Sequence, residues 1–500
     1  MPTGDESRRA SVNAAPTSVR DRALRGVPWA VLSALGPRSL TLVTTLVLAR
    51  LLAPSTFGLM AMAIVVLTVL RMLGELGLAG ALVVRQDLDR RGQGAVLTMM
   101  LAGGALATVL ALAFAPLAGI LLPDSHATSV LAVLAASLLV GGFNSFYDAV
   151  LQRELCLGPR LVALGCQAVA QAVVSITLAA FGAGVWSLVA GYLAGIASFG
   201  LGAFALAPYR VRPRFDRATA RSVLGTGSGF VLQGSAVYGQ QNVDYVVVGG
   251  VLGTASLGLY SMAYRITAFP SSAIAEPIAT VTFPAFAQMR HHGSEIEGAF
   301  LSALRTVSLV ACPFGVLLSA SAEPFTLALL GEEWSGMIGP FAVLGVWAAV
   351  RPVHITVGWL LVSLGHARAM GLVSVVLLAA LAVALLVAAR SGGLTAVALV
   401  MLAHVTLTLG LWATLVKRLA GVGLSVQWAA VRTIAAACLL AWLTAWVVAQ
   451  ASGSAGATPA LVLSLVAGAT AYLTTLRVLE PSVLRDGIRR SAQALGRVDG

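Results

Sequence analysis

Long apolar stretches recur from one end of this chain to the other, and they constrain its fold more than any other feature. Fourteen of them hold roughly twenty residues or more, and about twenty apolar residues in a helix cross the ~30 Å hydrocarbon core of a bilayer. Only 10% of the 500 residues are charged, whereas soluble domains carry about 25%. The sequence therefore predicts an all-α, polytopic membrane protein with about 14 transmembrane helices.

The predicted segments differ in length. Three of them, the second, the seventh and the eighth, are long enough to tilt, kink or end in an interfacial turn. In chain order the segments are Val27–Ala49, Phe57–Val83, Ala95–Leu122, Ala127–Val150, Leu161–Phe181, Val185–Ala207, Ser222–Val248, Ser256–Phe286, Phe300–Ala320, Met337–Leu364, Met370–Ala389, Leu394–Val416, Trp428–Ala449 and Pro459–Leu476.

Lys and Arg are distributed unevenly between the two sets of connections. If the N-terminal tail and every second connection are taken as one side, that side holds 24 Lys and Arg, whereas the other holds only Arg50 and Arg390. Short loops rich in Lys and Arg stay in the cytoplasm, so we expect a multi-pass protein with both termini in the cytoplasm. Anionic lipids of the inner leaflet account for the net charge of +12, and no nucleic-acid partner is expected.

An internal repeat organises the predicted helices. "ARLLAPSTFGLMAMA" (Ala49–Ala63) aligns without a gap on "GGVLGTASLGLYSMA" (Gly249–Ala263), at an offset of 200 residues. An even number of segments, six, separates the copies, so both have the same orientation. Parallel six-helix lobes related by an axis along the membrane normal follow, with a binding site between them near mid-bilayer. The identical pairs are Leu52/Leu252, Gly58/Gly258, Leu59/Leu259, Met62/Met262 and Ala63/Ala263.

The repeat and the composition together divide the chain into regions. The polar start, rich in Pro, Ser, Thr and Arg, is typical of a disordered tail, and the first apolar segment starts too late and is too long for a signal peptide. The predicted regions are a cytoplasmic tail (1–26), an N-lobe of six helices (27–209), a basic linker (210–221), a C-lobe of six helices (222–419), two further helices (420–477) and a second cytoplasmic tail (478–500).

Six arginines lie inside the predicted segments, and they are the candidates for chemistry. Arg305 and Arg432 are within a turn or two of the cytoplasmic surface, which a long side chain reaches by snorkelling. An arginine at the centre of a membrane helix costs roughly 3 kcal/mol on insertion scales, so the other four should face a polar interior. These four are Arg38, Arg71, Arg265 and Arg351.

Arg38 lies in "LSALGPRSLTLV", about eleven residues into the first segment. Pro37 has no amide hydrogen and Gly36 loosens the same turn, so the helix should break there. Broken backbone at this depth is tolerated where it lines protein or a water-filled cavity. The pattern predicts an anion site with a forked guanidinium donor suited to phosphate. The alternative is a structural kink with Arg38 paired to a buried carboxylate.

Two further arginines repeat or extend this pattern. Arg351 lies near mid-membrane in "VRPVHITVGW", again next to a proline, and is predicted to bind the same anion. Arg265 follows Tyr264 in "LYSMAYRITAFP", and both residues are candidates for substrate binding. The alternative for Arg265 is an ion pair with Asp244, which lies at a similar depth on the preceding segment.

Acidic residues in the segments are candidates for coupling to H⁺ or Na⁺. Arg71 and Glu75 stand one helical turn apart and either pair with each other or line the cytoplasmic mouth, where Arg71 would bind substrate. Glu276, before Pro277, is a lone carboxylate on a kinked helix, and Asp244 is the third candidate. No P-loop, nucleophile motif or metal motif occurs, and the four cysteines have the spacing of neither a metal knuckle nor a disulfide framework. We expect no catalytic residues, no metal and no cofactor.

Several motifs resemble a known family. "LARLLAPSTFGLMAMA" with "ELGLAGALVVRQDL", and "NVDYVVVGGVLGTASLGLYSMAYRI" with "FPAFAQMR", are similar to the signatures of Wzx-type polysaccharide flippases in the multidrug/oligosaccharidyl-lipid/polysaccharide exporter superfamily. The resemblance covers about residues 27–417. It departs from the family in two places. The loops hold less lysine than is usual in the family, and the last two predicted helices match the family as apolar helices but not in sequence motifs.

The resemblance implies a two-lobed, V-shaped carrier in the bacterial cytoplasmic membrane. Such a carrier moves a polyprenyl-pyrophosphate oligosaccharide from the inner to the outer leaflet by alternating access, for surface polysaccharide biosynthesis. The implied partners are the lipid-linked oligosaccharide and membrane lipids, with a polysaccharide polymerase and export machinery as further candidates. Arg38 and Arg351 would hold the pyrophosphate or an acidic sugar, Arg265 would complete the cluster, and apolar grooves would hold the prenyl tail.

Three alternative functions remain open at this level. A cation-coupled exporter of small molecules with the same fold would favour an acidic, aromatic cavity rather than a basic one. A membrane glycan polymerase or glycosyltransferase would bring an acidic metal motif or a large outer loop. A scaffold without transport activity would not need so many charges inside its apolar segments.

Overall fold

The computed structural model describes residues 36–121, 126–275, 296–365 and 367–480. Within these ranges the chain is helical almost throughout and contains no β-strand, and 11 helices are long and apolar enough to cross a membrane. The expectation of an all-α polytopic membrane protein is therefore confirmed. Both predicted tails fall almost wholly outside these ranges.

The helices follow the predicted apolar segments closely, because a run of about twenty apolar residues satisfies its backbone in a membrane only as a helix. After a first helix at 36–49 they are α3 (Pro54–Glu75), α4 (Leu78–Val84), α5 (Arg90–Leu121), α6 (Ala127–Leu134), α7 (Ala136–Arg153), α8 (Leu157–Ala180), α9 (Val185–Leu206), α10 (Arg217–Pro270), α12 (Ile296–Ala320), α13 (Ala322–Phe325), α14 (Ile338–Ser363), α15 (Ala367–Ala420), α16 (Leu424–Ala451) and α17 (Ala457–Leu479). Short non-α turns are η1 (Ser271–Ala275), η2 (Thr326–Leu330), η3 (Glu332–Met337) and η4 (Gly453–Ala455).

Two of the long helices, α10 and α15, are each kinked at a glycine with non-helical backbone angles, although the hydrogen-bonding pattern assigns each as one helix. α10 joins two predicted segments at Gly253 and α15 joins two at Gly393, each with a positive φ, 86° and 64°, that glycine adopts without steric cost. The long second segment divides between α3 and α4, where Leu76 and Gly77 are left-handed. The count of fourteen helices stays a prediction, because the first segment is described only from residue 36.

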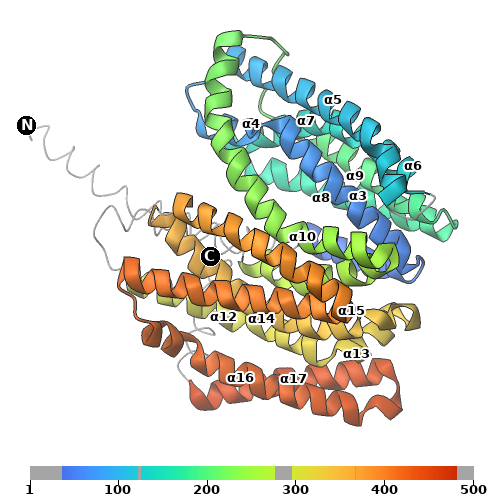
Figure 1. Cartoon of the computed structure of the whole chain (residues 1–500), viewed down its shortest axis with the longest axis vertical. Coiled ribbons are helices and arrows are strands. Elements are labelled where there is room, and N and C mark those ends of the chain that lie inside the picture. The colour runs from blue at the N-terminus through green and yellow to red at the C-terminus, as the bar shows by residue number, and fades with distance from the viewer. Residues whose placement is uncertain (1–35, 122–125, 276–295, 366, 481–500) are drawn as a thin grey trace, which may run out of the picture.

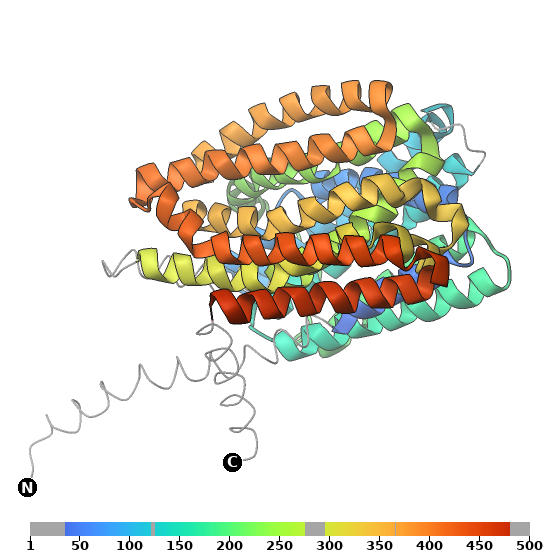
Figure 2. The same cartoon turned by 90° about the horizontal axis from the view of Figure 1, so that it is seen from below.

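The helices form two groups. Figure 1 shows α4 to α9 together in one group and α12 to α17 in a second, with α10 running from the first toward the second, and Figure 2 shows the long helices lying roughly along a common direction. Within the groups α8 packs on α9, α12 on α14, and α16 on α17; between them, α10 packs on α3. The residue boundaries of the predicted lobes stay predictions.

The contact between α3 and α10 brings the two copies of the repeat together. A Cβ atom on Gly58 would overlap the carbonyl oxygen of Thr254, and a Cβ on Gly258 would overlap that of Pro54. Both pairs are related by the 200-residue offset, so each copy makes the same contact on the other, as at a two-fold axis. The missing side chains let the two backbones touch, as small residues do between membrane helices.

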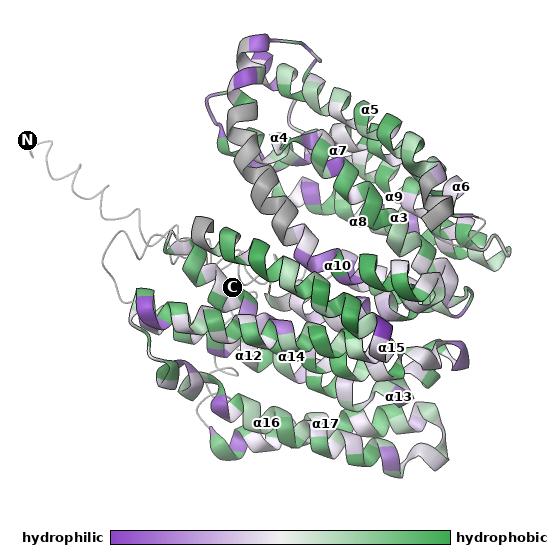
Figure 3. Ribbon diagram, in the orientation of Figure 1, coloured by the Kyte–Doolittle hydropathy of each residue, from purple (hydrophilic) through white to green (hydrophobic). Residues whose placement is uncertain are grey.

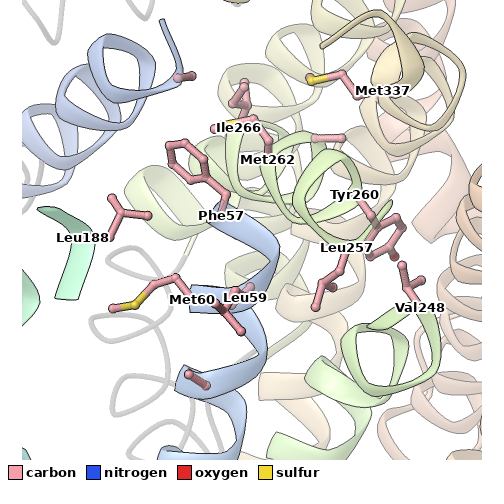
Figure 4. Close-up of a cluster of buried hydrophobic side chains, with 14 of the residues drawn as sticks. Phe57, Leu59, Met60, Leu188, Val248, Leu257, Tyr260, Met262, Ile266 and Met337 are labelled. Atoms are coloured by element: carbon pink, nitrogen blue, oxygen red, sulfur yellow. The ribbon is translucent and has the colours of Figure 1, made fainter. Parts of the chain in front are cut away.

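Apolar side chains surround this glycine contact. Figure 4 shows Phe57 of α3 beside Met262 and Ile266 of α10, and all three belong to one buried cluster to which both helix groups contribute. Large aliphatic side chains are also abundant on the outer surface, for example Leu407 and Leu372, which are about three-quarters exposed. Figure 3 shows hydrophilic residues gathered mostly at helix ends. A surface of this kind suits lipid rather than water.

Polar contacts also join the turn after the first helix to the segment before α14. The Nε1 of Trp334 donates to the carbonyl oxygen of Ala49 at 2.9 Å, and the Phe57 ring meets the Trp334 ring edge-on at 5.4 Å. Arg50 donates to the carbonyl oxygens of Leu329, at 2.7 Å, and Ala328. These bonds hold one end of the two helix groups together, and we refer to it as the closed end.

Gly258→Ala and Gly58→Ala should each destabilise the protein by about 1–3 kcal/mol, the usual cost of overpacking, and by similar amounts because the contact is reciprocal. Gly410→Ala is the matched control: it lies in a helix, a Cβ added there would have no atom within 4 Å, and the change should be neutral or stabilising by up to about 1 kcal/mol. Thermal unfolding of the purified protein in detergent measures all three. A Gly258→Ala variant that melts at or above the wild-type temperature would show that the backbones do not touch.

Candidate functional site

A cavity of about 690 Å³ lies where the first helix, α8 and the second half of α10 meet. We call it the central cavity. Its wall includes Arg38 and Thr41 from the first helix, Arg160 from α8, and Tyr264 and Arg265 from α10. Its volume is within the range of small-molecule binding sites, and guanidinium groups enter its wall from three different helices.

The three arginines of the central cavity have different partners. Arg160 is paired with Asp148 of α7, with an Nε to Oδ1 distance of 2.6 Å. Arg38 donates to the backbone carbonyl oxygen of Ser272. Arg265 is exposed to the cavity and makes no hydrogen bond or ion pair with any residue that the structure describes. An arginine in this state has all five N–H donors available for a ligand.

The predicted break at Gly36 and Pro37 lies at the edge of the described chain. Residues 36–49 are helical, and Pro37 itself lines the central cavity. The chain before residue 36 is outside the described ranges, so the kink stays a prediction. Glu276, a predicted coupling residue, also lies outside them.

Arg351 of α14 is set back from the central cavity, with Tyr264 forming the cavity wall. Its Nη1 donates to the Tyr264 hydroxyl at 3.1 Å, and its guanidinium carbon is 4.7 Å from the centroid of the Trp347 ring. Arg351 is not among the residues that line the central cavity. It can therefore act on a ligand there through Tyr264, by orienting the hydroxyl and by its charge.

Asp244 is completely buried beside the same aromatic residues. It accepts a hydrogen bond from the Tyr260 hydroxyl at 2.8 Å and one from the backbone amide of Tyr245 at 3.0 Å. The alternative ion pair between Arg265 and Asp244 is not formed. Tyr245 and Tyr264, which contact each other edge-on at 5.6 Å, both face the central cavity.

A second cavity of about 280 Å³ lies among α3, α7, α8 and α9. Arg71 lines it and is half exposed, and its Nη1 is 3.4 Å from Oε1 of Glu75, so the predicted pair one turn apart is formed. Ser145 donates to the same Glu75 oxygen at 2.6 Å. Gln167 lines both this second cavity and the central cavity.

A bridging cavity of about 50 Å³ runs beside the other two. Thr41, Gln171 and Arg265 line both it and the central cavity, whereas Tyr192 lines both it and the second cavity. The three cavities therefore share walls, and most of the shared side chains are polar.

An apolar groove of about 460 Å³ lies on the other helix group, between α12, α14 and α16. Val350, Val353 and Leu439 are typical of its wall, and Trp428 and Trp442 bring two indole rings to it. With almost no polar surface in its wall, the groove suits a hydrocarbon chain.

Sequence reasoning missed several residues of the polar cavities, among them Arg160, Gln167 and Gln171. α8 begins at Leu157, four residues before the predicted segment, so Arg160 belongs to a helix and reaches the central cavity. Gln167 and Gln171 are four residues apart in an otherwise apolar helix, and their amides make no hydrogen bond within the described chain. Two amide side chains on the same face of an otherwise mostly apolar helix were the signal that could have predicted that this face of α8 lines a polar cavity.

Comparison with known proteins identifies the family. A family described as "Polysaccharide biosynthesis protein" matches residues 47–339. The succinoglycan biosynthesis transport protein ExoT of Rhizobium meliloti (strain 1021) is 30% identical over 327 residues, which span 64% of this chain and 65% of that protein. The lipopolysaccharide biosynthesis protein WzxC of Escherichia coli (strain K12) is 23% identical over 352 residues, 69% of this chain and 71% of WzxC.

Solved structures show the same fold at low sequence identity. The lipid II flippase MurJ in an inward closed conformation superposes with a TM-score of 0.77 at 12% identity, covering 91% of this chain and 99% of MurJ. An inward-facing multidrug resistance MATE family transporter of the MOP superfamily gives a TM-score of 0.60 at 16% identity, covering 78% of this chain and 99% of the transporter. Because the family match covers more than half of the chain, this multi-pass membrane protein belongs to the polysaccharide biosynthesis protein family.

Proposed function

We propose that the protein translocates a polyprenyl-pyrophosphate oligosaccharide from the inner to the outer leaflet of the bacterial cytoplasmic membrane, with both termini in the cytoplasm. The observation that carries this proposal is Arg265, an arginine inside a membrane-spanning helix that faces a 690 Å³ cavity without a hydrogen-bonding partner among the described residues. The names of ExoT, WzxC and MurJ, which refer to polysaccharide transport, lipopolysaccharide biosynthesis and a lipid II flippase, support it.

The charge of the central cavity favours an anionic ligand. Burying a guanidinium in the membrane is costly, and a pyrophosphate offsets that cost by accepting charge-assisted, forked hydrogen bonds. Arg265 and Arg38 enter from different helices that wall the cavity, which suits a group with oxygens on two phosphorus atoms. The same charges disfavour a cationic drug, so the alternative of a small-molecule cation exporter is less well supported.

The apolar groove provides a place for the lipid tail. A lipid-linked glycan needs a polar, basic cavity for its head and a hydrocarbon surface for its prenyl chain, and this molecule has one of each. Because each methylene removed from water contributes about 0.8 kcal/mol, a long prenyl chain is held in lipid or in an equally apolar groove throughout the transfer. The chain therefore does not need to cross the polar cavities.

Alternating access completes the proposal. The closed end, held by Arg50 and Trp334, lies at the far end of the first helix from the N-terminus, which we take as the outer side. Opening there breaks these contacts, and a cation gradient supplies the driving force. Among the candidate coupling residues Asp244 fits best, since its hydrogen-bond partners are neutral groups, whereas Glu75 is paired with the cationic side chain of Arg71. A polysaccharide polymerase or export complex would receive the product on the outer face.

Arg265→Ala should lower the rate of flipping about ten-fold or more, because a hydrogen bond to a charged group contributes about 1.5–3 kcal/mol and 1.4 kcal/mol is a factor of ten. Arg265→Lys should be intermediate, since lysine keeps the charge but loses the fork. The measurement is transfer of a labelled lipid-linked oligosaccharide in proteoliposomes.

Arg432→Ala is the matched control for this experiment, because Arg432 is an exposed arginine of α16 away from all three polar cavities. Unchanged flipping by Arg265→Ala at normal protein levels, or an equal loss in Arg432→Ala, would argue against an anion site in the central cavity. Sugar transfer by the purified wild-type protein would point instead to an enzyme.

Ala435→Trp should reduce flipping of a long-chain prenyl substrate, because the added indole fills part of the apolar groove that Ala435 lines. Its neighbour Ala436 is exposed on the same helix and does not line the groove, so Ala436→Trp should transport normally. The comparison uses the same proteoliposome assay with long-chain and short-chain prenyl carriers. Equal activity of the two tryptophan variants on the long-chain carrier would place the tail elsewhere.

A further inference from the structure

The second cavity differs from the central cavity in its balance of charge. Its two charged wall residues, Arg71 and Asp148, are each compensated by a partner: Arg71 by Glu75 at 3.4 Å and Asp148 by Arg160 at 2.6 Å. The central cavity, by contrast, has Arg265, which has no acidic partner among the described residues. The wall of the second cavity is therefore polar and close to neutral, and it does not favour a phosphate.

Hydrogen-bonding groups nevertheless dominate the second cavity. Eight of the 13 residues in its wall have polar side chains. Amides and hydroxyls both donate and accept hydrogen bonds, which matches ligand hydroxyl groups that do the same. The eight polar residues are Thr68, Arg71, Ser137, Asn144, Ser145, Asp148, Gln167 and Tyr192.

Gln167 is the residue best placed to recognise a ligand in this cavity. Its amide makes no hydrogen bond with any described residue, and it stands on the wall between the central and second cavities. Asn144 differs, because its Nδ2 already donates to the carbonyl oxygen of Ile196 at 2.9 Å and holds α7 to α9, while its buried Oδ1 has no partner among the described residues. Tyr192 adds a hydroxyl group at the edge with the bridging cavity.

The Arg160–Asp148 ion pair forms the boundary between the two cavities. Arg160 lines the central cavity and Asp148 lines the second. A ligand whose phosphate lies at Arg265 can therefore extend from the basic central cavity into the neutral second cavity. The Arg160–Asp148 ion pair and Gln167 lie at the boundary that it crosses. The volume of about 280 Å³ is near the lower limit of the 300–1,000 Å³ typical of ligand sites, which suits one small polar unit.

We propose that the second cavity is a subsite for one uncharged saccharide unit of the cargo, with Gln167 and Tyr192 as its specificity-determining residues. This inference rests on the proposed function, because it takes the central cavity as the site of the pyrophosphate. The neutral wall selects a hexose over a hexuronic acid, since a carboxylate would meet Asp148 and would find Arg71 already engaged by Glu75.

The test measures binding of three probes to the full-length protein in nanodiscs: a bare polyprenyl pyrophosphate, the same lipid bearing one hexose, and the same lipid bearing one hexuronic acid. In the wild-type protein the hexose should improve the dissociation constant about ten-fold over the bare lipid, as expected for two hydrogen bonds. The hexuronic acid should give a smaller gain or none.

Gln167→Leu and Tyr192→Phe should each reduce the gain from the hexose several-fold. Tyr192 lines the second cavity but not the central cavity, so Tyr192→Phe should also leave binding of the bare lipid unchanged. The matched controls are Gln450→Leu and Tyr209→Phe. Gln450 is exposed at the end of α16, and the hydroxyl of Tyr209 bonds to Glu154 outside the cavities. Both controls should keep the full gain.

The outcomes separate this inference from the proposed function. If the bare lipid fails to bind, or binds equally to the Arg265→Ala variant, the proposed function fails and the subsite fails with it. If the bare lipid binds through Arg265 but the hexose adds nothing, the uronic acid binds better, or both cavity variants keep the full gain, only the saccharide subsite is rejected.

Discussion

The free-energy cost of placing a guanidinium group inside the membrane determines where the deep arginine side chains of this molecule can lie. An arginine in a membrane helix needs a polar, charged or aromatic partner, water or a ligand, and the deep arginines meet this need in different ways. Arg71 takes a carboxylate one turn away, Arg351 takes a tyrosine hydroxyl and an indole ring, and Arg265 faces the open cavity. Packing these side chains against lipid would be costly, and the polar cavities give Arg71 and Arg265 a polar surface instead.

The polar cavities and the apolar groove are lined by different helices. The basic and neutral cavities are lined by the first helix, by α3 and α7 to α9, and by the second half of α10, whereas the apolar groove belongs to α12, α14 and α16. An amphiphile bound to both would span the two groups. If the two helix groups move relative to each other, as the proposed function requires, the affinity for such a ligand would change with that motion.

Much of the fold could be predicted from the sequence because the signal is local. Apolar length sets each membrane helix, and the breaks at Gly253 and Gly393 fall in the short gaps left between predicted segments. The site could be predicted less well. Hydropathy gives the depth of a residue but not the direction of its side chain, so Arg351 was predicted in the cavity and lies behind Tyr264. Gln167 was missed because its position in a cavity wall depends on which helices pack against α8. That packing is not local in the sequence, so the local pattern does not identify it.

The reciprocal contact of Gly58 and Gly258 has a consequence for motion. Interlocked side chains resist rotation between helices, whereas two bare backbones that touch at a point can swivel while staying in contact. The crossing thus offers the proposed carrier a pivot. If the two helix groups separate at the closed end, Gly58 and Gly258 can stay in contact while the hydrogen bonds of Arg50 and Trp334 break.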